Sequence, residues 1–297
     1  MSKSAFVSIV GRPSSGKSTL LNSLCKAKVS IVSAVPQTTR AAVRGIVTED
    51  DCQLVFIDTP GLHESQKKLN LRLAAAACAA LADCDITLYL IDATRPPGKE
   101  EEEIVRRLAA LGERRIQSAL LAAVNKIDAP KAAAETCVSF LRAHLAALPP
   151  ERIIPVSALR ETNMDVLRAS LRALAPEGVF YYDGDCYTDQ SVPFRVAEIV
   201  REKCFLMLRE ELPHALYVNA GDSTLKDGVL YAHADIRCER ESQKGMIVGK
   251  GGAQIKKIRM AALADLKKIF DWPVKLELRV KTDRNWRQND SIIKAFT

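Results

Sequence analysis

The chain has 297 residues, of which 47% are hydrophobic and 27% charged, and its formal net charge is +7. This composition excludes disordered and fibrous proteins and fits about two globular domains. The positive surplus favours a polyanionic partner, either nucleic acid or an anionic membrane face, although a generically soluble basic protein has the same bulk numbers.

Short apolar runs alternate with helical patterns from residue 5 to residue 175. Strands that alternate with helices predict a doubly wound, mostly parallel α/β sheet. Residues 40–58 form two apolar runs around an acidic turn, so we expect one antiparallel hairpin at the sheet edge. The glutamates at 100–103 are expected to form a solvated helix start. The predicted strands are 5–10, 53–58, 86–92, 119–125 and 152–157, and the predicted helices are 18–27, 68–83, 101–111 and 134–148.

The pattern changes after residue 175. Residues 176–192 contain Gly, Pro, Asp and Tyr without periodicity, which is typical of a linker. Residues 193–297 then follow the order helix, strand, strand, helix, helix, strand, which predicts a smaller α+β domain. The predicted division of the chain is therefore a domain at 1–175, a linker at 176–192 and a domain with a C-terminal tail at 193–297.

A phosphate-binding pattern follows the first predicted strand. The sequence GRPSSGKS at residues 11–18 matches G-x-x-x-x-G-K-[ST] and leads into a predicted helix. Glycines let successive main-chain N–H groups point at phosphate oxygens, and the helix adds its partial positive end. Lys17 is expected to contact the β and γ phosphates, and the Ser18 hydroxyl to bind Mg²⁺. The predicted nucleotide contacts are Gly11, Arg12, Pro13, Ser14, Ser15, Gly16, Lys17, Ser18 and Thr19.

A second pattern, DTPG, begins at Asp58 after the apolar run LVFI. A carboxylate at the end of a buried strand, beside a phosphate loop, is suited to hold Mg²⁺ through water. The Gly61 N–H would approach the γ phosphate, where a side chain would obstruct it. The residues predicted to line the site here are Asp58, Thr59, Pro60, Gly61 and Leu62.

A third pattern, NKID, occupies residues 125–128 after another apolar run. The Asp128 carboxylate can accept hydrogen bonds from guanine N1–H and its 2-amino group, a donor pair that adenine lacks, so it predicts GTP over ATP. Asn125 can tie this loop to the phosphate loop, and the Lys126 stem can cover the base. A simple turn is the alternative interpretation. A weaker pattern, in which the Ala158 N–H would meet guanine O6, comprises Ser157, Ala158 and Leu159.

The sequence GKGG at residues 249–252 lies between two helical patterns. A G-x-x-G loop that joins two helices is typical of a K-homology (KH) domain, which binds single-stranded RNA, although a flexible turn is the alternative. Residues 244–287 carry twelve Lys or Arg against four Asp or Glu, which favours RNA binding. Trp286 either offers a stacking face or anchors the C-terminus. The predicted RNA contacts are Gly249, Lys250, Gly251, Gly252, Lys256 and Lys257.

A GTPase domain followed by a type II KH domain resembles the Era family over nearly the full chain. The matching segments are GRPSSGKSTLLN, PQTTR, DTPGLH, NKID, GMIVGKGGAQIKKI and NWR. The resemblance implies GTP/GDP and Mg²⁺ as ligands, and binding of the 3′ end of small-subunit (16S) ribosomal RNA. It also implies a role in 30S subunit assembly and peripheral association with the inner membrane.

Resemblance to related switch loops makes Thr39 the threonine whose hydroxyl closes over Mg²⁺ when the γ phosphate is present. We assign Lys17, Thr39 and Gly61 to catalysis. Two positions depart from relatives. Leu62 stands where Ras-like proteins carry a water-positioning Gln, so slow intrinsic hydrolysis is expected. Ser14 stands where many relatives carry an Asn that helps recruit potassium, which weakens the case for potassium-stimulated hydrolysis.

The leading hypothesis is a slow GTPase switch in which GTP alters how the KH domain holds ribosomal RNA. One alternative is an RNA-binding assembly module whose nucleotide site only stabilises the fold. The presence of Lys17, Ser18, Asp58 and a switch threonine together argues against it, since a purely structural site need not keep them all. The other alternative is a membrane-surface signalling GTPase that uses the basic segment on anionic lipid.

The cysteines indicate the compartment. Eight are present, and none are spaced as C-x-x-C, which predicts reduced thiols and neither a disulfide framework nor a zinc site. The sequence has no signal-peptide pattern at its N-terminus and no long uncharged apolar run. We therefore expect a cytoplasmic protein. We also expect a monomer.

Overall fold

The computed structural model describes residues 1–33, 43–58, 84–284, 286–289 and 292. Within these ranges the chain forms two compact units. The first comprises residues 1–30, 43–58 and 84–189, and the second comprises residues 31–33 together with the described part of 190–294. Each unit is described below by itself.

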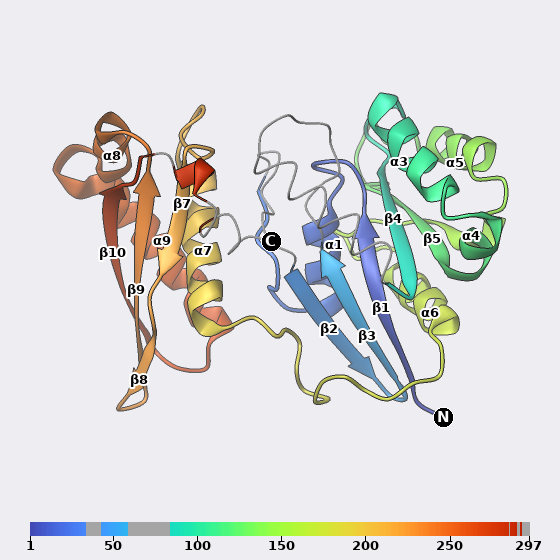
Figure 1. Ribbon diagram of the computed structural model, residues 1–297, viewed down its shortest axis with the longest axis horizontal. Helices are drawn as coiled ribbons and strands as arrows, with labels where there is room; N and C mark the ends of the chain where they lie inside the picture. The colour runs from blue at the N-terminus through green and yellow to red at the C-terminus, as the bar shows by residue number, and fades with distance from the viewer. Residues whose placement is uncertain (34–42, 59–83, 285, 290–291, 293–297) are drawn as a thin grey trace. The chain divides into compact units, whose positions relative to one another are not determined.

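The first unit is built on a six-stranded sheet with the strand order β2-β3-β1-β4-β5-β6 (Figure 1). All neighbouring strands run parallel except β2, which pairs antiparallel with β3 at the edge. This arrangement confirms the predicted fold class and the edge hairpin. The strands are β1 (Lys3–Val10), β2 (Val43–Glu49), β3 (Cys52–Asp58), β4 (Ile86–Asp92), β5 (Leu120–Asn125) and β6 (Ile153–Pro155).

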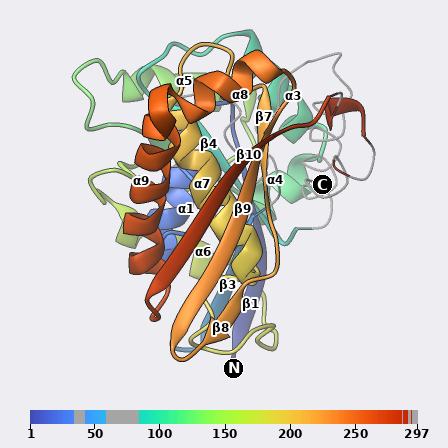
Figure 2. The same ribbon diagram turned by 90° about the vertical axis from the view of Figure 1, so that its left-hand side faces the viewer.

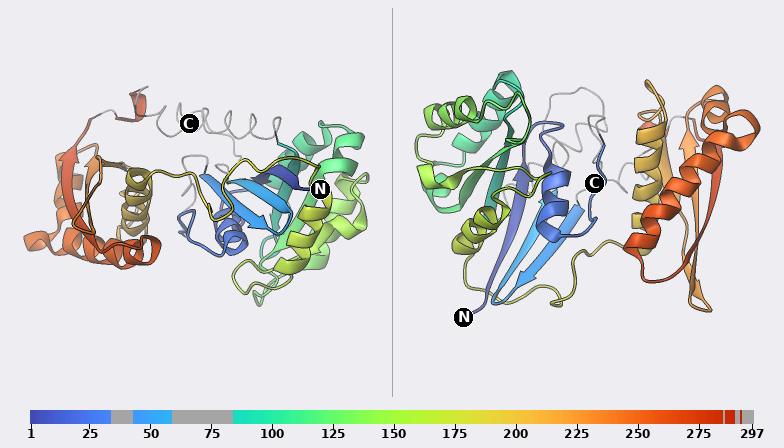
Figure 3. Two further views of the ribbon diagram at one scale, coloured as in Figure 1. Left: turned by 90° about the horizontal axis from the view of Figure 1, so that it is seen from below. Right: turned by 180° about the vertical axis from the view of Figure 1, so that it is seen from behind.

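Helices cover both faces of this sheet (Figure 3). The helices α3, α4 and α5 share one apolar cluster with β4 and β5, which includes Tyr89, Ile104 and Leu141. The helices α1 and α6 lie on the opposite face. The helices are α1 (Lys17–Cys25), α3 (Lys99–Ala109), α4 (Glu113–Ala119), α5 (Ala134–His144) and α6 (Met164–Leu174), with a 3₁₀ turn, η1 (Pro150–Arg152).

Polar residues end three of the parallel strands at one edge of the sheet. Asp58 ends β3, Asp92 ends β4 and Asn125 ends β5, and Asp92 pairs with Asn125 in register. Ligands of open α/β sheets bind at this carboxyl edge, because the loops that follow parallel strands emerge there together. The fold therefore brings three segments that are far apart in the sequence to one place.

The second unit contains a sheet with the order β10-β9-β7, in which β10 runs parallel to β9, β7 runs antiparallel to it, and the short β8 also pairs with β9 (Figure 2). Its elements are α7 (Val192–Met207), β7 (Leu216–Ala220), β8 (Thr224–Lys226), β9 (Val229–Cys238), α8 (Glu241–Val248), η2 (Lys250–Gly252), α9 (Ala253–Ile269), β10 (Val274–Thr282) and η3 (Trp286–Gln288). The order of the longer elements follows the prediction.

The core of the second unit lies between the sheet and the helices α7 and α9. It contains the fully buried Val200, Leu216, Ile236 and Leu266, which come from four different elements. Helical spacing in α7 and α9 and alternation in β9 direct these apolar side chains to one layer. The apolar pattern extends past Met207 to Leu212, yet α7 ends at Met207 and Leu208 takes an extended conformation.

Residues 176–189 contain no helix or strand, but they are held on the first unit by hydrogen bonds. The Gln53 side chain accepts hydrogen bonds from the main-chain N–H groups of Tyr181 and Tyr182 at 2.7 and 3.0 Å. The Ile46 N–H donates to the Tyr187 carbonyl at 3.0 Å, which places this segment along the edge strand β2. In the part of the chain that the structure describes, no helix is long and apolar enough to cross a membrane.

Candidate functional site

The phosphate-loop pattern forms the turn between β1 and α1. A Cβ atom on Gly11 would lie 2.4 Å from the Leu90 carbonyl oxygen. Gly16 has a φ of +100°, and a Cβ atom there would lie 2.5 Å from Asn125 Nδ2. Residue 11 therefore requires glycine for space, and residue 16 requires it both for space and for its positive φ. The missing side chains leave room for the Leu90 carbonyl and the Asn125 side chain to pack against the loop.

Lys17 lies inside this loop with only 7% of its surface exposed. Its ammonium group donates to the carbonyl oxygens of Gly11 and Arg12, both at 2.9 Å. Burial lowers the pKa of Lys17 to about 8, against the opposing influence of the Asp58 and Glu101 carboxylates. A desolvated cation held by neutral carbonyl groups is a favourable partner for an entering anion.

The Ser18 hydroxyl and the Asp58 carboxylate are adjacent at the start of α1. Ser18 Oγ donates to Asp58 Oδ2 at 2.7 Å, and Asp58 is fully buried. Ser30, which the sequence reasoning missed, donates its hydroxyl to the same oxygen at 2.9 Å. The Asn22 side chain accepts from the Val29 and Ser30 N–H groups, both at 2.8 Å, and so holds Ser30 in place. Hydroxyl and carboxylate oxygens are the donor set that Mg²⁺ prefers, so these residues fit that ion.

The NKID loop is joined to the phosphate loop by hydrogen bonds. Asn125 Nδ2 donates to the Ser15 carbonyl at 2.9 Å, and Asn125 Oδ1 accepts from the Ala158 N–H at 3.1 Å. Ser157 Oγ donates to Asp128 Oδ1 at 2.6 Å, which orients the carboxylate predicted to read guanine. Three loops from distant parts of the sequence therefore meet here. The Ala158 N–H, predicted to meet guanine O6, donates to Asn125 in this structure.

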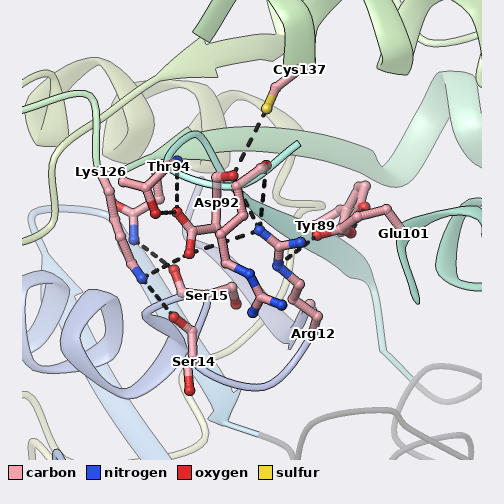
Figure 4. A network of polar contacts seen from close by, with 12 residues as sticks. Arg12, Ser14, Ser15, Tyr89, Asp92, Thr94, Glu101, Lys126 and Cys137 are labelled. Carbon is pink, nitrogen blue, oxygen red and sulfur yellow. Dashed lines mark hydrogen bonds and ion pairs between the residues drawn. The ribbon is translucent and has the colours of Figure 1, made fainter. Parts of the chain in front are cut away.

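A buried group of charged side chains lies behind the phosphate loop (Figure 4). Arg12 is 3% exposed, and its Nε atom lies 3.2 Å from Glu101 Oε1. Glu101 is fully buried and also accepts a hydrogen bond from the Tyr89 hydroxyl. The expectation of a solvated helix start at 100–103 is therefore wrong for Glu101, because α3 turns this side chain toward Arg12 and Tyr89. Asp92, in the same group, was also missed, although a polar residue that ends an apolar strand is a signal for it.

Some predicted site residues lie outside the described part of the chain. These are Thr39, Thr59, Pro60, Gly61 and Leu62, so their predicted roles stay predictions. Leu159, the last residue of the weaker guanine pattern, is 71% exposed.

The G-x-x-G loop connects α8 to α9 in the second unit. Gly249, Gly251 and Gly252 have φ values of +72°, +58° and +78°, in the region that favours glycine. Lys250, Lys256 and Lys257 are exposed on the loop and on the first turns of α9. The loop therefore presents main chain and positive charge to the solvent.

Trp286 anchors the chain after β10 and offers no stacking face. Its side chain is fully buried, and its indole N–H donates to the Ala215 carbonyl at 3.3 Å. The Tyr217 ring packs against it with the ring centroids 5.0 Å apart. Of the two interpretations of Trp286, the structure supports the anchor.

Comparison with known proteins identifies the family. A family model described as "50S ribosome-binding GTPase" matches residues 6–126, and a KH domain model matches residues 211–287. The GTPase Era of Treponema denticola is 47% identical over 99% of this chain and 99% of that protein. The chain belongs to the Era family of GTPases. The Era protein of Borreliella burgdorferi is 40% identical, again over 99% of both chains.

Solved Era structures share the fold of the whole chain. An Era variant from Aquifex aeolicus bound to GDP·AlF₄⁻ superposes with a TM-score of 0.91 at 33% identity, and covers 99% of this chain and 98% of its own. A complex of Era with MgGDPNP and nucleotides 1506–1542 of 16S ribosomal RNA has the same TM-score and identity, and covers 100% of this chain and 99% of its own. Membership in the Era family confirms the predicted family, the fold class and GTPase as the enzyme class.

Proposed function

We propose that the protein is a slowly hydrolysing GTPase switch that binds small-subunit ribosomal RNA through its KH domain. The observation that carries this proposal is the pair of hydrogen bonds made by the Asn125 side chain. They join the Ser15 carbonyl of the phosphate loop to the Ala158 N–H of the loop at residues 157–159. Loops joined in this way are ready to receive one guanine nucleotide. The solved complex of Era with MgGDPNP and 16S ribosomal RNA supports both ligands.

In the nucleotide site, each group has a proposed task. The Lys17 ammonium and the main-chain N–H groups of residues 11–19, except Pro13, bind the phosphates, and Asp128 selects guanine. Asn125 and Ser157 position these loops, as their hydrogen bonds indicate. The Ser18 hydroxyl and the Asp58 carboxylate hold Mg²⁺. When bound, that ion neutralises the charge that develops on the phosphates.

The KH domain is the proposed RNA-binding unit. Main-chain groups of residues 249–252 approach the sugar–phosphate backbone, because the glycines leave the loop without bulky side chains. The exposed ammonium groups of Lys250, Lys256 and Lys257 neutralise nearby phosphates. We propose residues 1–175 as the GTPase domain, 176–192 as the linker and 193–297 as the RNA-binding part.

Finer features of the proposal come from the family resemblance. They are binding at the 3′ end of the ribosomal RNA, assistance to assembly of the 30S subunit, a cytoplasmic location with peripheral association with the membrane, and a monomeric state. Binding of the basic segment to RNA is favoured over binding to anionic lipid because that segment contains the G-x-x-G loop.

The nucleotide half of the proposal is tested by measuring GTP turnover with purified protein. We expect slow turnover that requires Mg²⁺ and is abolished in Lys17→Ala, since the variant lacks the ammonium group predicted to contact the β and γ phosphates. Turnover of ATP at an equal rate, or no turnover above buffer, would contradict it.

The RNA half is tested with Gly251→Asp. Gly251 has a positive φ that strains any L side chain, but no atom lies within 4 Å of a Cβ placed there, so Asp meets no steric clash and adds negative charge to the loop. Gly228→Asp is the matched control, because Gly228 also has a positive φ and open space but lies in the turn between β8 and β9. We expect only Gly251→Asp to lose binding to a short single-stranded RNA with the 3′-terminal 16S sequence. Stronger binding of the protein to anionic vesicles than to this RNA would favour the membrane alternative.

A further inference from the structure

The buried carboxylate of Asp92 lies between the two loops that bind opposite ends of the proposed nucleotide. We propose that Asp92 is a positioning residue that couples the phosphate loop to the guanine-recognition loop, so that the two loops bind GTP or GDP as one unit. This inference rests on the proposed function, because it concerns the same site. Asp92 itself has no proposed contact with the nucleotide.

The guanine-recognition loop, which is the NKID loop at residues 125–128, contacts Asp92 through Lys126. The ammonium group of Lys126 lies 2.8 Å from Asp92 Oδ2 and also donates to the Ser14 carbonyl of the phosphate loop at 2.7 Å. Lys126 follows Asn125 directly and has a positive φ of 67°. The ion pair with Asp92 therefore holds the residue whose stem is predicted to cover the base.

The phosphate loop reaches Asp92 through Arg12. Arg12 Nη2 lies 3.8 Å from Asp92 Oδ2, the same oxygen that Lys126 contacts, and donates to the Asp92 carbonyl at 3.4 Å. The Arg12 side chain is buried among Asp92, Glu101 and Tyr89 (Figure 4), so it braces the loop from behind instead of reaching for a ligand.

The second carboxylate oxygen of Asp92 is held by Thr94, which follows the end of β4. Thr94 donates to Asp92 Oδ1 from its N–H at 2.9 Å and from its hydroxyl at 2.7 Å. Burial acts to raise the pKa of Asp92, but the hydrogen bonds from Lys126 and Thr94 outweigh it and lower that pKa. The carboxylate is thus ionised, oriented and 1% exposed, between one cation from each loop.

The physical consequence is coupling between the two loops. Asp92 and Arg12 are buried, so the attraction between them is little screened, whereas the Lys126 side chain is 34% exposed and solvent partly screens its attraction to Asp92. Without the Asp92 charge, Arg12 retains the Glu101 carboxylate, whereas Lys126 retains the Ser14 carbonyl, which is a neutral partner. The guanine loop should then move independently of the phosphate loop, and the base should contribute less to the affinity.

The test compares three variants by their affinity for GDP. Asp92→Asn removes the charge and keeps the shape. Thr94→Val removes one of the hydrogen bonds that orient Asp92, and it decides the question if Asp92→Asn does not fold. Asp85→Asn is the matched control, because Asp85 precedes the same strand at its opposite end and accepts a hydrogen bond from the Phe6 N–H at 2.8 Å.

We expect Asp92→Asn to weaken GDP binding by about tenfold or more through faster dissociation, and Thr94→Val by about threefold. Asp85→Asn should stay within about twofold of the wild type. The loss should be smaller for inosine diphosphate, which lacks the 2-amino group, because the coupled loop reads that group. Equal losses for both nucleotides would indicate a merely structural role and overturn the proposal, as would GDP binding by Asp92→Asn within about twofold of the wild type.

A double-mutant cycle gives a second readout. Arg12→Gln and Lys126→Met should weaken GDP binding non-additively when Asp92 is present, and additively within about twofold in the Asp92→Asn background. The same non-additivity in both backgrounds would overturn the proposal. If the wild type failed to bind GDP at all, the proposed function would fail, which is distinguishable from a wild type that binds GDP with no effect of Asp92.

Discussion

Asn125 and Ser15 are joined by a hydrogen bond of 2.9 Å from the Asn125 carboxamide nitrogen to the Ser15 carbonyl oxygen. The residues are 110 positions apart in the sequence. The same nitrogen lies so close to Gly16 that a Cβ atom at that position would clash with it. The NKID loop and the phosphate loop thus pack against each other, and the position of the Asn125 side chain requires glycine at residue 16.

Asn125→Ala should weaken GDP binding by about 10- to 100-fold. The change removes hydrogen bonds to two loops. The Ser15 carbonyl and the Ala158 N–H then lose their partner, which weakens the binding free energy by about 1–3 kcal/mol. Equilibrium titration with a fluorescent GDP analogue measures this. The control is Asn219→Ala on the exposed side of β7, which should leave the affinity unchanged. An equal loss in both variants would contradict the prediction.

GDP affinity should fall as the pH rises above 8. The pKa of Lys17 in the free protein is lowered to about 8, and a bound phosphate raises it, so above pH 8 binding requires uptake of a proton. The affinity should be nearly constant from pH 7 to 8 and then decline by up to about tenfold per pH unit. Calorimetric titrations from pH 7 to 9 provide the measurement. Lys17→Arg, whose guanidinium stays charged, should lack the decline, and a decline of the same slope in that variant would refute the assignment.

Trp286→Ala should destabilise the second unit by about 3–5 kcal/mol, because a fully buried aromatic side chain is removed and a cavity remains. The protein has two tryptophans, and the other, Trp272, is 41% exposed, so Trp272→Ala should change the free energy of unfolding by about 0.5 kcal/mol or less. Chemical denaturation followed by circular dichroism compares the two. Similar costs for both variants would argue against the anchoring role of Trp286.

Glu101→Gln should destabilise the first unit by about 3 kcal/mol, since the buried Arg12 guanidinium loses a charged partner. Glu103 is the matched control on the same helix. Its ion pairs with Arg106 and Arg107 are at the surface, so Glu103→Gln should cost about 1 kcal/mol or less. Thermal unfolding measures the difference. The prediction fails if the two variants unfold at the same temperature.

The sequence by itself determined the features that are encoded locally. The phosphate loop and the G-x-x-G loop are recognisable because glycines at fixed spacing permit backbone conformations that other residues disfavour, and Gly16 and Gly251 have such conformations in the structure. The strands and helices are recognisable because apolar spacing follows the period of each element. These signals lie within a few residues of one another, so no knowledge of distant contacts is needed.

Only the tertiary structure decided which way individual polar side chains point. Arg12 belongs to a phosphate-binding pattern yet turns to Glu101, Glu101 belongs to an acidic run yet is buried, and Trp286 is covered by residues from the start of β7. The pairing of Asp92 with Lys126 likewise depends on two strands that are neighbours in the sheet. The energy of a charged or aromatic side chain is set by what surrounds it in space, and those surroundings come from segments that the local sequence does not contain.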